Sequence, residues 1–225
     1  MEQELPVRTR KDTDYKHYVP VHVVWEITLA CNLKCKHCGS RAGKIRPDEL
    51  TTEECLEIVE SMARLGTREV SLIGGEAFLR KDWPEIIRAL RRPDICVGLH
   101  TGGWAITSER IDEAVAAGVN AIGVSIDGLE ELHDRVRGVK GSYRKALEVI
   151  KRATEEGLET SVSSQIGPET IPLLRQMMME FIEAGAKQWQ IQLTVAMGNA
   201  VDNAEYLLQP YQLDELFPLL NELLD

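Results

Sequence analysis

Short apolar runs alternate along this chain with longer stretches in which apolar residues recur at helical spacing. Six such runs follow one another, and this order is typical of parallel strands joined by crossover helices. Most of the runs are too apolar for a sheet with one face in water, so we expect both faces to be covered. The predicted strands are residues 21–28, 69–74, 96–101, 121–127, 159–165 and 188–196.

Helix start and stop signals fall between these runs. Thr51 and Glu54 form a capping-box pattern ahead of an amphipathic stretch. Further candidate N-caps are Ser108, Ser142 and Thr170. Glycines fall where helices should end, at positions 66, 118, 157 and 185. We therefore expect an α/β fold of six strand–helix units that forms one domain over residues 21–225, after a polar N-terminal segment of residues 1–20.

Composition narrows the possible classes of protein. The 225 residues are 44% hydrophobic and 28% charged, which excludes a disordered chain. The formal net charge of −10 argues against nucleic acid as a partner. No stretch approaches the roughly 18 consecutive apolar residues of a spanning helix, so we expect a cytoplasmic protein with no membrane partner.

Residues 27–47, here called the cysteine loop, reverse the acidic trend. They contain no acid and five cations, which are Lys34, Lys36, Arg41, Lys44 and Arg46. The same segment holds three of the five cysteines, Cys31, Cys35 and Cys38, at C-x3-C-x2-C spacing. An odd number of cysteines and no export signal argue against a disulfide framework. Three thiolates on one loop can instead converge on a soft metal centre.

Two kinds of metal site remain open at this point. A structural zinc site needs four ligands, and His37 next to Cys38 is poorly placed to be the fourth, so a distant partner such as His100 or Cys96 would be required. A cubane iron–sulfur cluster has four irons, and three cysteines would leave one iron open to an outside ligand. We interpret Cys55 and Cys96 as buried apolar residues.

Small and polar residues follow the other predicted strands. They are Gly74–Glu76, Thr101–Gly103, Ser125–Gly128, Ser163–Gln165 and Ala196–Asn199. In parallel α/β proteins the loops at the carboxyl ends of the strands converge, so we expect these residues to surround one site.

Three motifs in order carry a family resemblance. The chain resembles the radical S-adenosylmethionine (SAM) superfamily in WEITLACNLKCKHC, LIGGEAFLR and VSIDG. It is similar to the superfamily's branch of pyrroloquinoline quinone and mycofactocin-type (SPASM-associated) peptide maturases in HDRVRGVKGSY. The resemblance implies a partial (β/α)6 TIM-like barrel. It also implies a [4Fe-4S] cluster on Cys31, Cys35 and Cys38, whose open iron binds SAM. One electron then cleaves SAM to methionine and a 5'-deoxyadenosyl radical, which removes hydrogen from a substrate.

The resemblance further implies contacts with SAM. The methionine amino group would meet Gly74, Gly75 and Glu76, and the carboxylate would meet Ser125 and Arg137. Four more residues are implied around the nucleoside: Asp127 at the ribose or substrate, Ser163 at the ribose, and Leu193 and His37 beside the adenine. For Asp127 a turn-capping role stays open.

The chain also departs from the family pattern. Ala77 replaces a common proline, Gly102 a common asparagine, and Asn199 a common arginine. The cysteine-rich C-terminal extension of the maturases, which binds auxiliary clusters, is absent from these residues, and we expect the sequence to be truncated before it.

The leading functional hypothesis is a radical SAM enzyme that acts on a peptide or protein side chain. One alternative is the same chemistry on a small metabolite such as a tetrapyrrole or sugar, and another is a non-catalytic, metal-bound structural protein. The expected electron donor is a reduced flavodoxin or ferredoxin.

Overall fold

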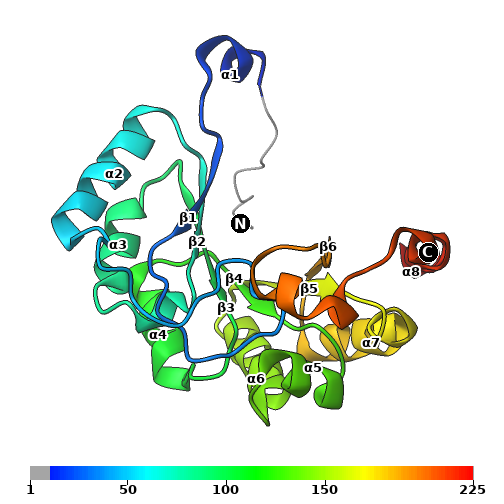
Figure 1. Ribbon diagram of the computed structural model, residues 1–225. Coiled ribbons are helices and arrows are strands. Elements are labelled where there is room, and N and C mark those ends of the chain that lie inside the picture. Colours follow the sequence, from blue (N-terminus) through cyan, green and yellow to red (C-terminus); the bar gives the residue numbers. More distant parts are fainter. Residues whose placement is uncertain (1–10, 225) are drawn as a thin grey trace.

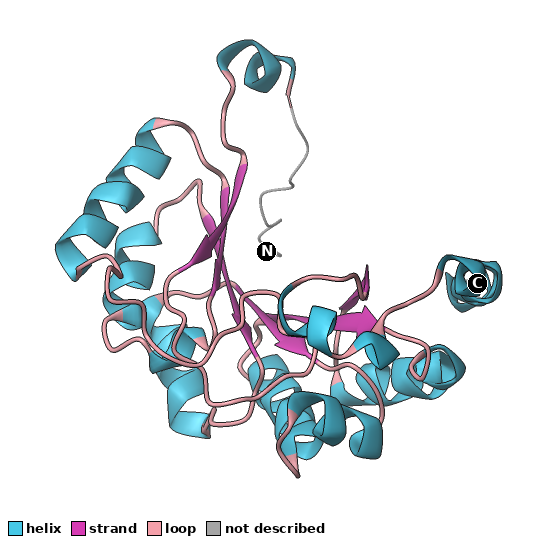
Figure 2. Ribbon diagram, in the orientation of Figure 1, coloured by secondary structure: helices cyan, strands magenta, loops and turns pink. Residues whose placement is uncertain are grey.

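Six parallel strands form one sheet in the computed structural model, which describes residues 11–224 (Figure 1). The sheet runs in chain order and curls into part of a barrel, with most of the helices on the convex side (Figure 2). The strands are β1 (His22–Glu26), β2 (Glu69–Ile73), β3 (Cys96–Thr101), β4 (Ala121–Ser125), β5 (Glu159–Ile166) and β6 (Gln188–Leu193). The predicted partial barrel is confirmed.

The core lies between the convex face of the sheet and its helices. Leu72, Leu99 and Ile122 on the strands are fully buried, as are Ile86 and Ile150 on helices that cover them. The helices are α1 (Asp12–His17), α2 (Thr52–Arg64), α3 (Trp83–Leu90), α4 (Ser108–Ala117), α5 (Glu130–Arg137), α6 (Ser142–Glu155), α7 (Leu174–Ala184) and α8 (Leu213–Leu224). No helix within residues 11–224 is long and apolar enough to cross a bilayer.

Most predicted helix boundaries are confirmed. Thr51 Oγ1 accepts from Glu54 N at the start of α2, and the Glu54 carboxylate accepts from Thr51 N. The four predicted terminal glycines all have positive φ. The N-cap prediction is wrong by one residue at Ser108 and Ser142, which are the first residues of their helices. Thr170 makes no capping bond and donates instead to the carbonyl of Asp127.

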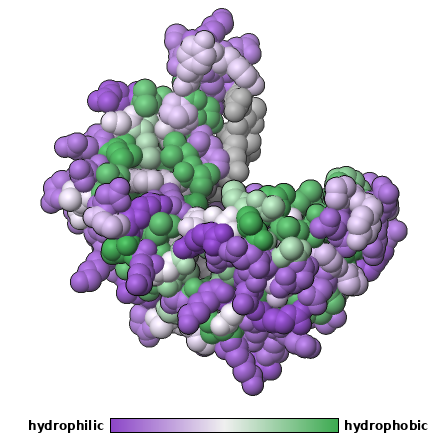
Figure 3. Space-filling view, in the orientation of Figure 1, coloured by the Kyte–Doolittle hydropathy of each residue, from purple (hydrophilic) through white to green (hydrophobic). Residues whose placement is uncertain are grey.

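The concave face of the sheet differs from the prediction. We expected both faces to be covered, but the residues of β1 and β6 are only partly buried or exposed, and β5 alternates buried and partly buried positions. His22, Ser71, His100, Ser163 and Gln190 line cavities on this concave side. Figure 3 shows a hydrophobic rim of the hollow on the β6 side, where Leu193, Val195 and Met197 are exposed.

Two helices were not predicted. α1 lies within the expected polar N-terminal segment, where Asp14 forms a 2.7 Å ion pair with Arg68; residues 1–10 of that segment lie outside the described residues. α5 follows β4 and precedes the covering helix α6. It carries the HDRVRG motif to the carboxyl end of the sheet, which makes it part of the candidate site.

Candidate functional site

A cavity of about 380 Å³ opens at the carboxyl ends of the strands. The loops after β1, β2 and β3 and the ends of β4, β5 and β6 contribute to its wall. Among the predicted site residues, those that line it are Cys31, Cys35, His37, Cys38, Gly74, Gly75, Ser125, Asp127, Arg137 and Ser163. The predicted gathering of these strand-end residues around one cavity is therefore seen in the structure.

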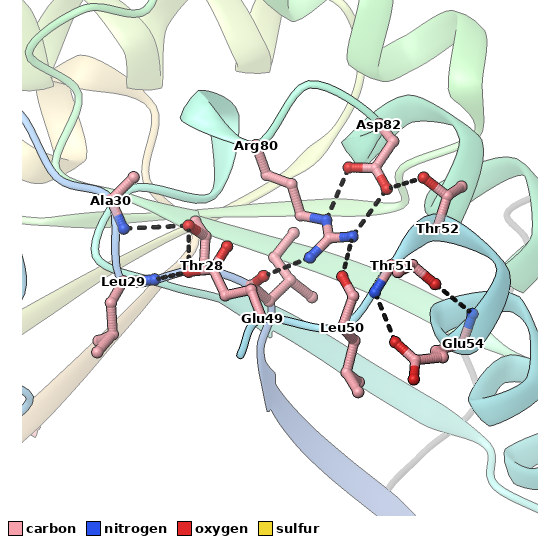
Figure 4. Close-up of polar contacts among 11 residues, drawn as sticks. Thr28, Leu29, Ala30, Glu49, Leu50, Thr51, Thr52, Glu54, Arg80 and Asp82 are labelled. Atoms are coloured by element: carbon pink, nitrogen blue, oxygen red, sulfur yellow. Dashed lines mark hydrogen bonds and ion pairs between the residues drawn. The ribbon is translucent and has the colours of Figure 1, made fainter. Parts of the chain in front are cut away.

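Figure 4 shows how the start of the cysteine loop is anchored. Glu49 Oε1 accepts hydrogen bonds from Thr28 Oγ1 at 2.9 Å and from Leu29 N at 2.8 Å. Arg80, in the motif after β2, donates to the carbonyl oxygens of Ile27 and Leu50 at 3.0 and 2.9 Å. The two side chains fix the backbone just before Cys31, and neither was predicted from the sequence.

The glycines after β2 let this loop lie directly against the strand end. Gly75 N donates to Thr28 O at 2.8 Å, and Glu76 N donates to Ala30 O at 2.7 Å. A Cβ atom at Gly75 would lie 2.5 Å from Ala30 O and 2.8 Å from the Cβ of Cys31. Glycine is therefore required here for close backbone approach.

Two other segments hold the far side of the loop. Lys34 N and Lys36 N donate to the carbonyl oxygens of Arg137 and Val136, which are free C-terminal acceptors of α5. Asn199, in the 3-10 helix η3 (Gly198–Asp202), donates from Nδ2 to Cys35 O at 3.0 Å and from N to Cys38 O at 2.9 Å. Asn199 was noted only as a departure from the family pattern, and the structure gives it a local role.

The thiols lie in a poorly solvated environment. Burial raises the pKa of Cys31 to about 11 and also raises the pKa of Cys35. Arg137 Nη1 lies 3.7 Å from Cys35 Sγ and opposes the rise at Cys35. Thiolates at these positions would therefore need a metal to compensate their charge.

The donor set fits an iron–sulfur cluster better than a single ion. Within residues 11–224, no three His, Cys, Asp or Glu side chains are arranged to bind one metal ion. Cys96, one of the distant zinc ligands considered, begins β3 and so lies about 16 Å along the strand from its carboxyl end. His100 does line the cavity. Three cysteines around a roomy cavity match a larger centre with an open position.

Asp127 links the cysteine loop to α5. Its Oδ2 lies 2.7 Å from His37 Nε2 and 2.6 Å from Arg137 Nε. Burial alone would raise the pKa of Asp127, but the charge of Arg137, together with the charge and hydrogen bond of His37, outweighs burial and holds that pKa well below its usual range. Nδ1 of His37 is buried and has no hydrogen-bond partner in the described part of the chain, so a ligand in the cavity could supply one.

Two predicted residues do not line the cavity. Glu76 is buried behind its wall, where its carboxylate accepts from Thr101 Oγ1 at 2.8 Å and Gly102 N at 3.0 Å, and burial raises its pKa. Leu193 ends β6 and is 39% exposed. Conversely, Gln190 and Gln192 line the cavity without having been predicted. Their two-residue spacing on one strand face was the available signal.

Comparison with known proteins gives the family. The model of the radical SAM superfamily matches residues 25–194, more than half of the chain. The chain belongs to the radical SAM superfamily. The cofactors that follow from this membership are a [4Fe-4S] cluster and SAM.

Individual relatives match this chain over only part of their own length. The chain is 34% identical over 150 residues to Fe-coproporphyrin III synthase of Methanosarcina barkeri, which covers 66% of this chain and 38% of that protein. It is 31% identical over 211 residues to PqqA peptide cyclase of Bradyrhizobium diazoefficiens, with coverages of 91% and 54%. The chain thus spans about half or less of the length of these relatives.

A solved structure supports the fold independently. SuiB of Streptococcus suis bound to SAM has a TM-score of 0.78 at 17% identity, and the match covers 95% of this chain and 49% of SuiB. A second structure of SuiB, bound to its precursor peptide SuiA, has a TM-score of 0.77 at 18% identity, with coverages of 95% and 48%. At this identity the likeness establishes the shared fold.

Proposed function

We propose that this chain forms the cofactor-binding core of a radical SAM enzyme that removes a hydrogen atom from a peptide or protein side chain. In this proposal Cys31, Cys35 and Cys38 hold the [4Fe-4S] cluster. When bound, the cluster would pass one electron from an external donor to SAM, whose cleavage to methionine and a 5'-deoxyadenosyl radical is the chemistry that the side chains of the protein lack. The chain itself binds and orients the reactants and excludes water.

The wall of the cavity suggests how SAM would be oriented. Gly74 and Gly75 line the cavity and are the candidates for the methionine amino group. Ser125 and Arg137 are the candidates for its carboxylate, with a guanidinium held at a fixed place by Asp127. Ser163, which is paired in register with Ser125, is the candidate for the ribose. Roles for Glu76 and Leu193 would require them to move toward the cavity.

The observation that favours a peptide substrate is the neutral polar lining of the first cavity. Below the first cavity lies a second one of about 680 Å³, which shares Ser71, His100 and Gln190 with it. Among the described residues that line the first cavity, Arg137 is the one Lys or Arg, its charge is balanced by Asp127, and none is Phe, Tyr or Trp. Hydroxyl and amide groups of this kind suit peptide amides better than a carboxylate-bearing macrocycle.

The exterior of the cysteine loop suggests the electron donor. Of its five cations, Arg41 and Arg46 form ion pairs with Asp202 and Glu26. Lys34, Lys36 and Lys44 are exposed, and no ion pair is found for them within residues 11–224. A small acidic redox protein such as a reduced flavodoxin or ferredoxin would be attracted to this patch on an otherwise acidic protein.

A labelling experiment separates the possible substrates. Reconstituted enzyme is incubated with SAM, reductant and either deuterated candidate peptides or deuterated coproporphyrin-type tetrapyrroles, because one relative is an Fe-coproporphyrin III synthase. The proposal expects deuterium in 5'-deoxyadenosine when the substrate is a deuterated peptide, and none when it is a deuterated tetrapyrrole. Deuterium transfer from the tetrapyrrole, with none from any peptide, would replace it with the small-molecule alternative.

A further inference from the structure

The carboxylate of Asp127 is the meeting point of three segments. Oδ2 contacts His37 of the cysteine loop and Arg137 of α5, at 2.7 and 2.6 Å. Oδ1 accepts a hydrogen bond from Gln165 N of β5 at 3.0 Å. The residue is 2% exposed. Both oxygens are therefore engaged inside the protein, although the residue borders the cavity.

The backbone of Asp127 is held as firmly as its side chain. Its N–H donates to His133 Nδ1 at 3.2 Å, and its carbonyl accepts from Thr170 Oγ1 at 3.1 Å. A carboxylate fixed in this way can hold a long arginine side chain in one conformation and offset the entropy that ordering it costs.

We propose that Asp127 is a positioning residue that fixes the guanidinium of Arg137 beside Cys35 and ties His37 of the cysteine loop to the end of β4. The inference rests on the proposed function, because it takes Cys35 as a cluster ligand. In this proposal Asp127 contacts Arg137 and His37 and does not contact SAM itself.

The placement of Arg137 gives Asp127 its effect on the site. The guanidinium reaches to 3.7 Å from Cys35 Sγ, and the carbonyl of Arg137 accepts from Lys34 N, the residue before Cys35. Charges and hydrogen-bond donors next to a ligating sulfur tune a metal centre and orient its ligands. Releasing Arg137 would therefore loosen the cysteine loop at Cys35 and disorder a cation at the edge of the cavity.

A matched control residue for Asp127 lies on α5, the helix that carries Arg137. Asp134 is also a structural carboxylate, and it accepts from Ser142 Oγ and Tyr143 N, both at 2.9 Å, at the start of α6. Asp127→Asn and Asp134→Asn should both lower the melting temperature. Asp127→Asn should also affect the cysteine loop, whereas Asp134→Asn should not.

The first measurement uses the cluster-free protein. Iodoacetamide alkylation is followed at each cysteine by mass spectrometry, with buried Cys55 and Cys96 as internal controls. Asp127→Asn should speed alkylation of Cys35 about tenfold and leave Cys55 and Cys96 within about twofold of wild type. Equal acceleration at all three would mean general destabilisation and would overturn the inference.

The second measurement uses the reconstituted protein. Asp127→Asn should weaken SAM binding at least about tenfold, with Asp134→Asn close to wild type. If Asp127 acts through Arg137 and His37, then adding Asp127→Asn to a protein that already carries Arg137→Gln and His37→Gln weakens SAM binding no further. Additive losses contradict the inference. Failure of the wild-type protein to bind a cluster would instead contradict the proposed function, whatever the alkylation rates.

Discussion

The close approach of Gly75 to the cysteine loop makes Gly75→Ala a sharp perturbation. The added Cβ would lie 2.5 Å from Ala30 O, 2.7 Å from Leu29 O and 2.8 Å from the Cβ of Cys31. All three distances are below van der Waals contact, and two involve backbone atoms that cannot rotate away. The loop must move as a unit by several tenths of an ångström.

The expected cost follows from overpacking. Forcing an extra methyl group into a well-packed site costs about 1 to 3 kcal/mol. At roughly 2 to 4 °C per kcal/mol for a chain of this size, the melting temperature should fall by about 2 to 12 °C. Because the displaced atoms include Cys31, we also expect the protein to lose most of its capacity to bind a cluster.

Gly43→Ala is the matched control within the same loop. Gly43 pairs with Ala30 through a backbone bridge, but a Cβ there meets no atom within 4 Å. The free energy of unfolding of this variant should lie within about 1 kcal/mol of the wild-type value, and the variant should bind iron and sulfide normally. The assay is thermal unfolding of the cluster-free protein together with iron and sulfide content after reconstitution. Equal behaviour of the two variants, in either direction, would refute the close-approach argument.

Three further predictions concern the cysteines, His133 and the exposed lysines. Cys35→Ala should abolish cluster binding, measured as iron content, whereas Cys55→Ala should retain the cluster and lose about 1 to 3 kcal/mol in denaturant unfolding from lost packing. A Cys55→Ala protein without iron would contradict this. Burial lowers the pKa of His133 from 6.5 to about 4. The stability that neutral His133 contributes is therefore complete above pH 6.5 and is lost as the pH falls toward 4. Thermal melts should show this loss of stability, and His133→Asn should reduce the pH dependence. Replacing Lys34 and Lys36 by Glu should slow reduction by an acidic donor protein about tenfold at low ionic strength, and a rate independent of salt would argue against docking there.

The sheet could be predicted because each strand has one strongly apolar face. The predicted strand 96–101 matches β3 at both ends, and the other strands differ by one to three residues. The largest error is at β6, where the predicted strand continues to Ala196 but the strand stops at Leu193. There the chain turns toward the cysteine loop, and hydropathy carries no signal for such a turn.

The site was predictable where a residue type carries chemistry by itself. Three closely spaced cysteines predict a metal centre. The small residues at the strand ends lie together because the strands are parallel. Glu49 and Asn199 act through geometry alone, since an amide or carboxylate that bonds to loop carbonyls or amides has no distinctive neighbours in sequence. Asp127 and Arg137 were both named, but not as partners, because pairing depends on the unpredicted helix α5.

Electron paramagnetic resonance of the anaerobically reconstituted and reduced protein, recorded with and without SAM, tests the cofactor assignment most directly. We expect the signal of a reduced [4Fe-4S] cluster whose shape changes when SAM binds, because only three cysteines are available to four irons. A colourless protein that carries zinc, or a cluster signal that SAM leaves unchanged, would contradict an open iron site on Cys31, Cys35 and Cys38.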